Sequence, residues 1–276
     1  MCQKRLGAEL RKLRESAGLS IELAAAVLEC SKGKISRIET GVSGVRPVEL
    51  RALLAAYGVE GSDLGQVLLE MAREGRKRGW WNRYGDVLSD GFADLAELES
   101  KANRLLTWET ILVPGLLQTP DYVRVLFQSG RLDAPKEEMD RYVDGRMHRQ
   151  QVLDSPQAPA LWAVLYEPVL HAKLGGSGVM RGQLTHLAHM AQRERVTVQV
   201  LPYTAEAHQG LNGPFGILGM PGSEIDVVRT ETAAAALYIE DENQVNAYRL
   251  AFDQLRAAAL GPAPSLSLIR EMAQLL

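Results

Sequence analysis

Two short helix-forming segments joined by a very tight turn constrain this chain more than any other feature. Ser20 is a favourable helix N-cap before an apolar and alanine-rich run that ends at Leu28. Ser31 begins a second run, which ends at Gly41. Only residues 29 and 30 separate the two runs. A turn of this length is too short for antiparallel stacking and favours two helices that cross at a steep angle.

The segments on either side of this pair are also predicted to be helical. Leu6, Leu10 and Leu13 recur at helical spacing before the pair. After it, Pro47 begins one helix and Ser62 caps another. The composition then changes near residue 79 from aliphatic and basic to aromatic and acidic. We therefore predict an all-α, five-helix domain over residues 1–79.

The second helix of the tight pair carries a polar and basic outer face. In a helix-turn-helix unit this helix enters the major groove of DNA, where Lys, Arg and Ser side chains contact bases and phosphates. The residues predicted to face the core are Leu23, Ala25, Leu28, Ile35 and Ile38. The residues predicted to bind DNA are Ser20, Ser31, Lys32, Lys34, Ser36 and Arg37. The alternative is a solvated face on a small helical bundle.

The charge distribution favours DNA binding over a solvated face on a helical bundle. The whole chain has a formal charge of −3, but residues 1–80 hold 14 Lys and Arg against 10 Asp and Glu, a net +4. The remaining residues hold 17 against 24, a net −7. The basic run Arg76-Lys77-Arg78 at the end of the first domain could contact the DNA backbone or be solvated. Positive charge is therefore concentrated in the part with the tight turn.

The rest of the chain combines helices with short strands. One long amphipathic helix is predicted from Phe92 to Leu106, followed by helices at 121–128 and 135–153. The predicted strands are Leu161–Tyr166, Val196–Leu201, Phe215–Met220, Asp226–Thr232 and Ala236–Ile239. Further helices are predicted at 179–192, 242–260 and 264–276. We predict a helical connecting region over residues 80–158, an α+β domain with helices packed on a sheet over 159–276, and the α+β class overall.

No catalytic, cofactor or metal site is predicted. His171, His186, His189 and His208, with Glu167, form only a loose metal-ligand set. The glycine-rich stretch at 175–178 lacks the spacing of phosphate and dinucleotide loops. The chain has two cysteines and no stretch of about 18 apolar residues. We therefore expect a cytoplasmic, membrane-free protein that is not an enzyme.

The first domain resembles the Xre/Cro-type helix-turn-helix regulators. The resemblance is carried by Leu10-Arg11-Lys12-Leu13-Arg14, Gly18-Leu19-Ser20, Cys30-Ser31 and Ile35-Ser36-Arg37-Ile38-Glu39-Thr40-Gly41. Three positions depart from the family pattern. Ile21 replaces a frequent phosphate-bracing Gln, Glu29 replaces the usual turn Gly, and Gly33 occupies a position that often contacts bases. Base contacts would then shift to the neighbouring basic residues of the same helix.

The remaining sequence resembles the actinobacterial group of antitoxin-like regulators, whose genes lie beside one for a small partner protein. The matching segments are Val113–Tyr122, Val196–Pro202, Gly213–Phe215 and Ala251–Arg256. This resemblance implies transcriptional control, often of development or secondary metabolism, with the second half binding a partner or sensing a signal.

The expected function is therefore regulation through sequence-specific binding to a double-stranded DNA operator. One recognition helix buries a small interface, so specificity normally requires two half-sites about 34 Å apart and hence a homodimer. The C-terminal domain is expected to bind the small partner protein encoded nearby. Three alternatives stay open: sensing of a small-molecule ligand, an antitoxin whose main task is sequestering its partner, and an enzyme fused to a DNA-targeting domain.

Overall fold

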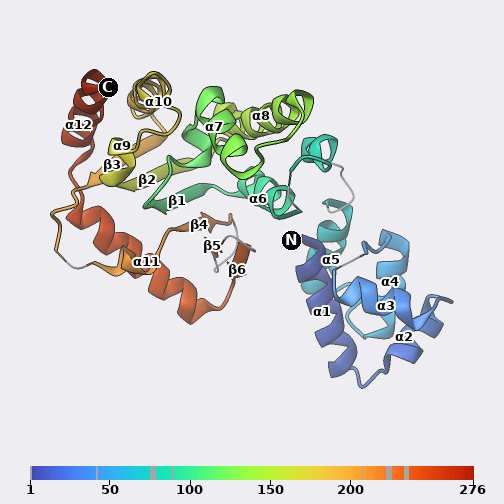
Figure 1. Ribbon diagram of the computed structural model, residues 1–276. Coiled ribbons are helices and arrows are strands. Elements are labelled where there is room, and N and C mark those ends of the chain that lie inside the picture. Colours follow the sequence, from blue (N-terminus) through green and yellow to red (C-terminus); the bar gives the residue numbers. More distant parts are fainter. Residues whose placement is uncertain are drawn as a thin grey trace. The chain divides into compact units, whose positions relative to one another are not determined.

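The computed structural model describes residues 2–41, 43–74, 79–88, 90–206, 208–221, 226–232 and 236–276 (Figure 1). Contacts divide the chain into two compact units, residues 1–82 and 83–276. The second unit thus spans nearly all of both regions predicted beyond residue 79. The described residues contain no helix that is long and apolar enough to cross a membrane.

The first unit consists of helices packed around one apolar core. Its helices are α1 (Cys2–Ser16), α2 (Ile21–Val27), α3 (Lys32–Glu39), α4 (Pro47–Ala56) and α5 (Asp63–Glu74). The core draws on α1, α3, α4 and α5 through fully buried side chains, which include Leu10, Ile35, Leu50, Leu53, Leu54 and Leu68. The five helices predicted from the sequence are confirmed, with α2 and α3 slightly shorter than expected.

The inward face of α2 differs from the prediction. Leu23 was expected in the core, but it is 53% exposed, whereas Ala24 is 0% exposed. Ile21 and Leu28 pack against the core beside Ala24 and Ala25. These four positions follow the i, i+3, i+4, i+7 spacing of one helical face, and Leu23 lies off that face. Ile21, which replaces the expected phosphate-bracing Gln, is therefore a packing residue.

The turn between α2 and α3 places a non-glycine residue in the left-handed region. Glu29 has φ of 49° and is the only non-glycine residue with positive φ among those that the structure describes. Backbone hydrogen bonds close the turn, with the Cys30 amide donating to the Ala25 carbonyl at 2.9 Å. Because the Cβ atom makes this conformation unfavourable, the position occupied by Glu29 favours glycine.

The second unit is an α+β structure that begins with a short helix and a strand. The η1 turn (Trp80–Tyr84) crosses the boundary between the units, and α6 (Asp90–Lys101) leads into β1 (Arg104–Glu109). The elements that follow β1 are η2 (Gly115–Leu117), α7 (Pro120–Gly130), α8 (Lys136–Gln150), η3 (Gln151–Asp154), β2 (Ala160–Tyr166), α9 (Pro168–His171), α10 (Ser177–Met190) and β3 (Val196–Leu201). The carboxyl-terminal elements are η4 (Gln209–Asn212), β4 (Phe215–Gly219), β5 (Val227–Glu231), β6 (Ala236–Ile239), α11 (Glu242–Ala258) and α12 (Pro262–Leu275).

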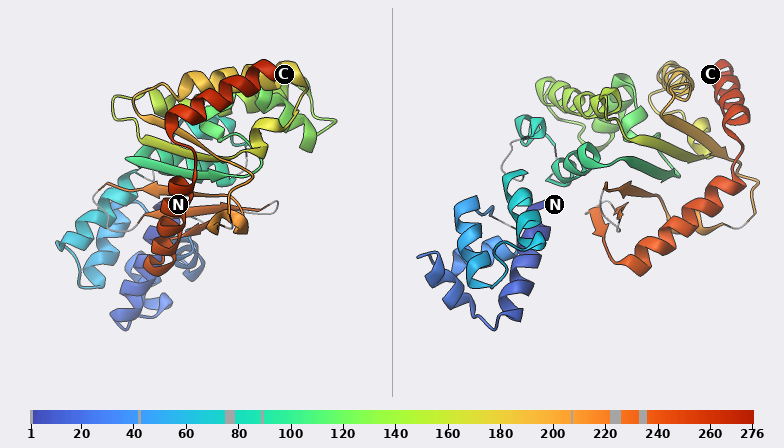
Figure 2. Two further views of the ribbon diagram at one scale, coloured as in Figure 1. Left: turned by 90° about the vertical axis from the view of Figure 1, so that its left-hand side faces the viewer. Right: turned by 180° about the vertical axis from the view of Figure 1, so that it is seen from behind.

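The strands form one six-stranded mixed sheet in the order β3-β2-β1-β4-β5-β6. β1, β2 and β3 are parallel, whereas β4, β5 and β6 continue the sheet in antiparallel pairs from β1. Helices α7, α8, α10 and α12 lie on one face of the sheet, and α11 lies on the other (Figures 1 and 2). Trp108, Val164, Ile217 and Phe252 belong to the core between the sheet and α11. The predicted α+β class is confirmed.

One predicted element was wrong. The helix expected from Phe92 to Leu106 ends at Lys101, and Leu105 and Leu106 belong to β1. The residues after Asn103 alternate between the two faces of the sheet. Leu105 is buried on one face and Trp108 is buried on the other. A short apolar run of this kind fits both helical and strand periodicity, and pairing with β2 and β4 decides in favour of the strand.

Replacing Glu29 with Gly is expected to stabilise the first unit by about 1 kcal/mol, because glycine adopts the left-handed conformation without the Cβ penalty. Hydrogen–deuterium exchange of the α2 and α3 amides would measure the change as slower exchange. Gly18, with φ of 67° and open space around a Cβ atom, offers the reverse control. Gly18→Ala should speed the same exchange, and unchanged exchange in both variants would contradict this account.

Candidate nucleic-acid interface

Helix α3 divides into a buried side and an exposed side that carries most of the predicted DNA-binding residues. Ile35, Ile38 and Glu39 are buried. Four other residues of the helix are exposed, namely Lys32, Gly33, Ser36 and Arg37, and so is Ser31 just before it. Ser31 is the N-cap residue of α3, and its hydroxyl makes no capping hydrogen bond. The amino end and outer face of α3 therefore present hydroxyl, ammonium and guanidinium groups to solvent.

Arg37 is the basic side chain of α3 that the surrounding protein leaves most available. It makes no ion pair with any residue that the structure describes, whereas both lysines of α3 do. A Cβ atom at Gly33 would lie 3.6 Å from Nη1 of Arg37, so the guanidinium extends over Gly33 toward the amino end of the helix. The missing side chain at Gly33 thus gives Arg37 space at the position that often contacts bases.

Lys34 is held against α4. Its Nζ lies 2.7 Å from Oε1 of Glu49, and its side chain is only 34% exposed. Arg46 Nε also donates to Glu49 Oε1, at 2.9 Å. The hydrogen bond from Arg46, followed by that from Lys34, lowers the pKa of Glu49 to about 2. Because Glu49 already compensates its charge, Lys34 is less available to an outside anion than an exposed, unpaired cation would be.

Lys32 and Ser20 make looser local contacts. Lys32 Nζ lies 2.7 Å from Glu22 Oε1, and both side chains are more than half exposed. Exposed pairs of this kind contribute little to stability, so Lys32 can exchange Glu22 for a phosphate oxygen at small cost. The Ser20 hydroxyl accepts a hydrogen bond from the Leu23 amide at 3.3 Å and caps α2.

A buried ion pair fixes α3 to α1. Arg14 Nε donates to Glu39 Oε1 at 2.6 Å, and Arg14 Nη2 donates to Oε2 at 3.1 Å. Arg14 also donates to the Leu19 carbonyl at 2.8 Å, just before α2. A bidentate guanidinium–carboxylate pair restricts orientation as well as distance. This pair therefore holds α1, the start of α2 and the end of α3 in one arrangement, with Arg37 on the outside.

The other predicted basic contact lies outside the described residues. This contact is the run Arg76-Lys77-Arg78, which falls in the segment 75–78.

The histidines considered as metal ligands are not brought together. His171 pairs with Glu167 at 3.2 Å, and His208 accepts a hydrogen bond from the Gly210 amide at 3.2 Å. Burial lowers the pKa of His186, with a smaller contribution from His189. Within the described parts of the chain, no group of three or more His, Cys, Asp or Glu side chains could hold a metal ion.

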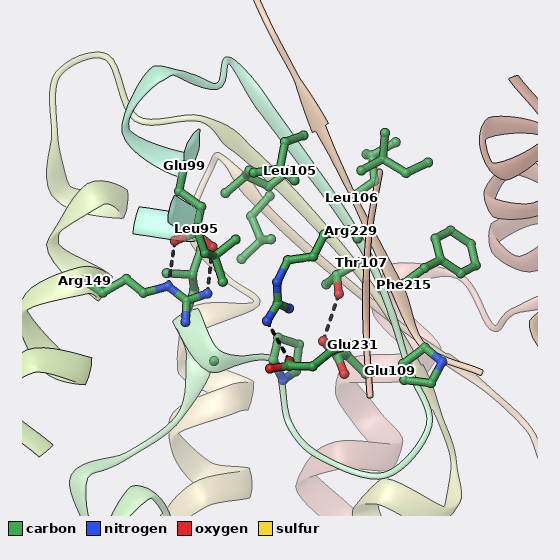
Figure 3. Close-up of a pocket in the computed structure, with 18 residues that line it drawn as sticks. Leu95, Glu99, Leu105, Leu106, Thr107, Glu109, Arg149, Phe215, Arg229 and Glu231 are labelled. Atoms are coloured by element: carbon green, nitrogen blue, oxygen red, sulfur yellow. Dashed lines mark hydrogen bonds and ion pairs between the residues drawn. The ribbon is translucent and has the colours of Figure 1, made fainter. Parts of the chain in front are cut away.

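The second unit contains a cavity with charged and apolar walls that the sequence did not indicate. Its volume is about 130 Å³, and β1, β4, β5, α6, α8 and the segment around η2 line it (Figure 3). Its ionisable side chains are Glu99, Glu109, Arg149, Arg229 and Glu231. These residues lie far apart in the sequence, and only the alternation of Leu105, Thr107 and Glu109 on one face of β1 could have indicated part of the cavity.

Comparison with known families assigns a model to each unit. A model described as a helix-turn-helix domain matches residues 5–66, which include most of α1, the helices α2 to α4 and the start of α5. A second model, described as a domain of unknown function (DUF5753), matches residues 92–271, more than half of the chain. No curated protein and no solved structure matches the chain significantly. The helix-turn-helix match supports DNA binding by a regulator of the Xre/Cro type.

Arg37→Ala is expected to weaken binding to the operator by about 1–3 kcal/mol, because it removes an exposed guanidinium that suits base acceptors. Lys34→Ala should have a smaller effect, since Glu49 already compensates the lysine charge. Fluorescence anisotropy of a labelled operator fragment at fixed salt would compare the two variants.

Ile38→Ala serves as the control for folding, because it opens a cavity in the core and should lower the melting temperature together with the affinity. Wild-type affinity in Arg37→Ala would exclude the outer face of α3 as the recognition surface.

Proposed function

The chain belongs to the DUF5753 family, and on this premise we propose that it is a dimeric, sequence-specific transcriptional regulator whose second unit binds a small partner protein encoded nearby. The observation that carries the DNA-binding part is the outer face of α3, where Arg37 is exposed and unpaired among the described residues beside Ser36. The protein would act by binding and not by catalysis, and its work would be done in the cytoplasm.

The dimer is proposed from the size of the recognition surface. The eight-residue α3 can contact only a few base pairs, and such a surface gives little specificity alone. Two copies on half-sites about 34 Å apart would present two recognition helices to the same side of DNA. The net charge of −7 in residues 81–276 opposes contact with phosphates. Affinity for DNA would therefore come from the first unit.

Partner binding is proposed for the second unit because it exposes large apolar side chains. The most exposed aliphatic ones are Ile111, Leu132, Leu211, Leu237, Leu250 and Leu275. Leu237 lies on β6, which is the last strand at one edge of the sheet that the described residues form. Edge strands and apolar side chains are common elements of protein interfaces.

A second candidate function is the sensing of a small-molecule ligand by the second unit. The cavity beside β1 supports it, since a concave site with apolar walls and a few convergent charged groups is typical of ligand binding. The two candidates differ in what changes the affinity for DNA: a protein in the first case and a small molecule in the second.

Footprinting on the promoter of its own gene tests the DNA-binding proposal. We expect two protected half-sites, centred about one helical turn apart, and a complex that contains two copies of the chain. Sedimentation analysis of the complex would count the copies. A single protected half-site bound by one copy would contradict the dimer and leave DNA binding itself in place.

Isothermal titration calorimetry with the product of the neighbouring gene tests partner binding. We expect saturable binding that Arg37→Ala leaves unchanged, because Arg37 belongs to the first unit. Introduction of a charge at the edge strand, as in Leu237→Asp, should weaken this binding. Absence of any binding heat at several temperatures would favour ligand sensing.

A further inference from the structure

The cavity in the second unit is built on one lateral row of the sheet. Thr107 of β1 pairs with Gly216 of β4, and Gly216 pairs with Arg229 of β5. Thr107 and Arg229 therefore point to the same face of the sheet. Glu109 lies two residues after Thr107 on β1 and points to that face as well. A Cβ atom at Gly216 would meet only the Leu106 carbonyl oxygen within 4 Å among the described residues, so the space above Gly216 is open. Figure 3 shows Thr107, Glu109 and Arg229 around the cavity.

Every cation that lines the cavity already has a carboxylate partner. Arg149 Nε and Nη2 donate to the two oxygens of Glu99 at 2.6 and 2.7 Å. Arg229 Nη2 lies 2.6 Å from Oε2 of Glu231, whose side chain is exposed. These two pairs are complete ion pairs, and they leave the carboxyl group of Glu109 as the remaining charge.

Glu109 itself is held by a hydroxyl group. The Thr107 hydroxyl donates to Glu109 Oε1 at 2.9 Å, and no ion pair to Glu109 is formed within the part of the chain that the structure describes. Three carboxylates and two guanidiniums therefore line the cavity, which leaves one uncompensated negative charge when Glu109 is ionised. Leu95, Leu105 and Leu116 supply apolar wall beside this charge.

We propose that the cavity binds a small organic cation, with its ammonium group against the Glu109 carboxylate and its apolar part over Gly216. A cavity of about 150 Å³ holds a benzene molecule, so the observed 130 Å³ suits a group of nearly that size. An acceptor atom on the same molecule would satisfy Nε of Arg229, which is buried without a hydrogen-bond partner among the described residues. The inference rests on the second candidate function, ligand sensing.

Ligand binding should depend on pH through Glu109. Burial is the largest of the effects that raise its pKa to about 7. The groups that face it are Thr107 on β1, Arg229 and Glu231 on β5, Arg149 on α8 beside Glu99 of α6, and Tyr122 on α7. A cation requires the ionised carboxylate, whose fraction rises about tenfold between pH 6 and pH 8 for this pKa. Affinity should increase by about the same factor.

The probe is benzylamine, which stays protonated over this range, compared with benzyl alcohol, which has the same ring and no charge. Calorimetry with the full chain in the absence of DNA should detect benzylamine binding that strengthens about tenfold from pH 6 to pH 8. Benzyl alcohol should bind at least about tenfold more weakly at pH 8, because it cannot pair with the carboxylate.

Two variants test the charge of Glu109 and the space above Gly216 separately. Glu109→Gln keeps the shape and removes the charge, so it should abolish the pH dependence and weaken benzylamine binding at least about tenfold. Gly216→Val fills the floor and keeps Glu109. A Cβ atom at position 216 would lie 3.7 Å from its nearest neighbour, the Leu106 carbonyl oxygen, so the strand can accept the side chain. It should also prevent binding.

Asp154→Asn is the matched control, because Asp154 is an exposed carboxylate paired with Arg193 outside the cavity. It should leave benzylamine binding unchanged.

The melting temperature provides a second measurement. Because the pKa of Glu109 is raised in the folded protein, its ionisation lowers the stability as pH rises from about 4.5 to 7. Glu109→Gln should therefore melt at a higher temperature than the wild type at pH 8.

Equal binding of benzylamine by the wild type and Glu109→Gln, or of benzylamine and benzyl alcohol, would overturn the proposal. So would the absence of binding up to about 10 mM. Since the titration contains no DNA and no partner protein, such a result would leave the DNA-binding proposal intact and would exclude only this ligand class for the cavity.

Discussion

Strand β1 is the element on which the second unit depends, because the direction of the sheet changes at this strand. It pairs in parallel with β2 and antiparallel with β4. Parallel neighbours need crossover connections, and these bring α7, α8 and α10 onto one face of the sheet (Figure 1). Between the antiparallel strands β4, β5 and β6, the residues that the structure describes form no helix. The same face is therefore less covered beyond β1, and the cavity lies there.

In the first unit, ion pairs decide which basic side chains are available to DNA. Arg14 is fixed by Glu39, and Lys34 and Arg46 share Glu49. The charges of these residues orient α3 against α1 and α4. Arg37, by contrast, stays exposed, since Gly33 provides the space into which its side chain extends. The positive charge of these residues does not by itself show which of them is available to DNA. Their packing and ion pairs make that distinction.

Local signals in the sequence predicted the elements, and contacts between distant residues explain what it missed. N-cap residues, glycines and β-branched runs indicated the five amino-terminal helices and five of the six strands. The predictions for Leu23 and for Leu105 and Leu106 were wrong, because a seven-residue helix and a short segment with few apolar residues each fit more than one period. The cavity could not be predicted, since its walls come together only through sheet register.

Glu109 differs from the buried carboxylates of the molecule in its ion pairing. The buried carboxylates Glu39, Glu49, Glu99 and Asp226 each pair with at least one cationic side chain. Glu109 is half-buried and has no such partner among the described residues, so its partial removal from water raises its pKa to about 7. Glutamine would have the same shape and avoid this penalty. The carboxyl group is therefore best explained by a cation that enters the cavity and completes the pairing from outside the chain.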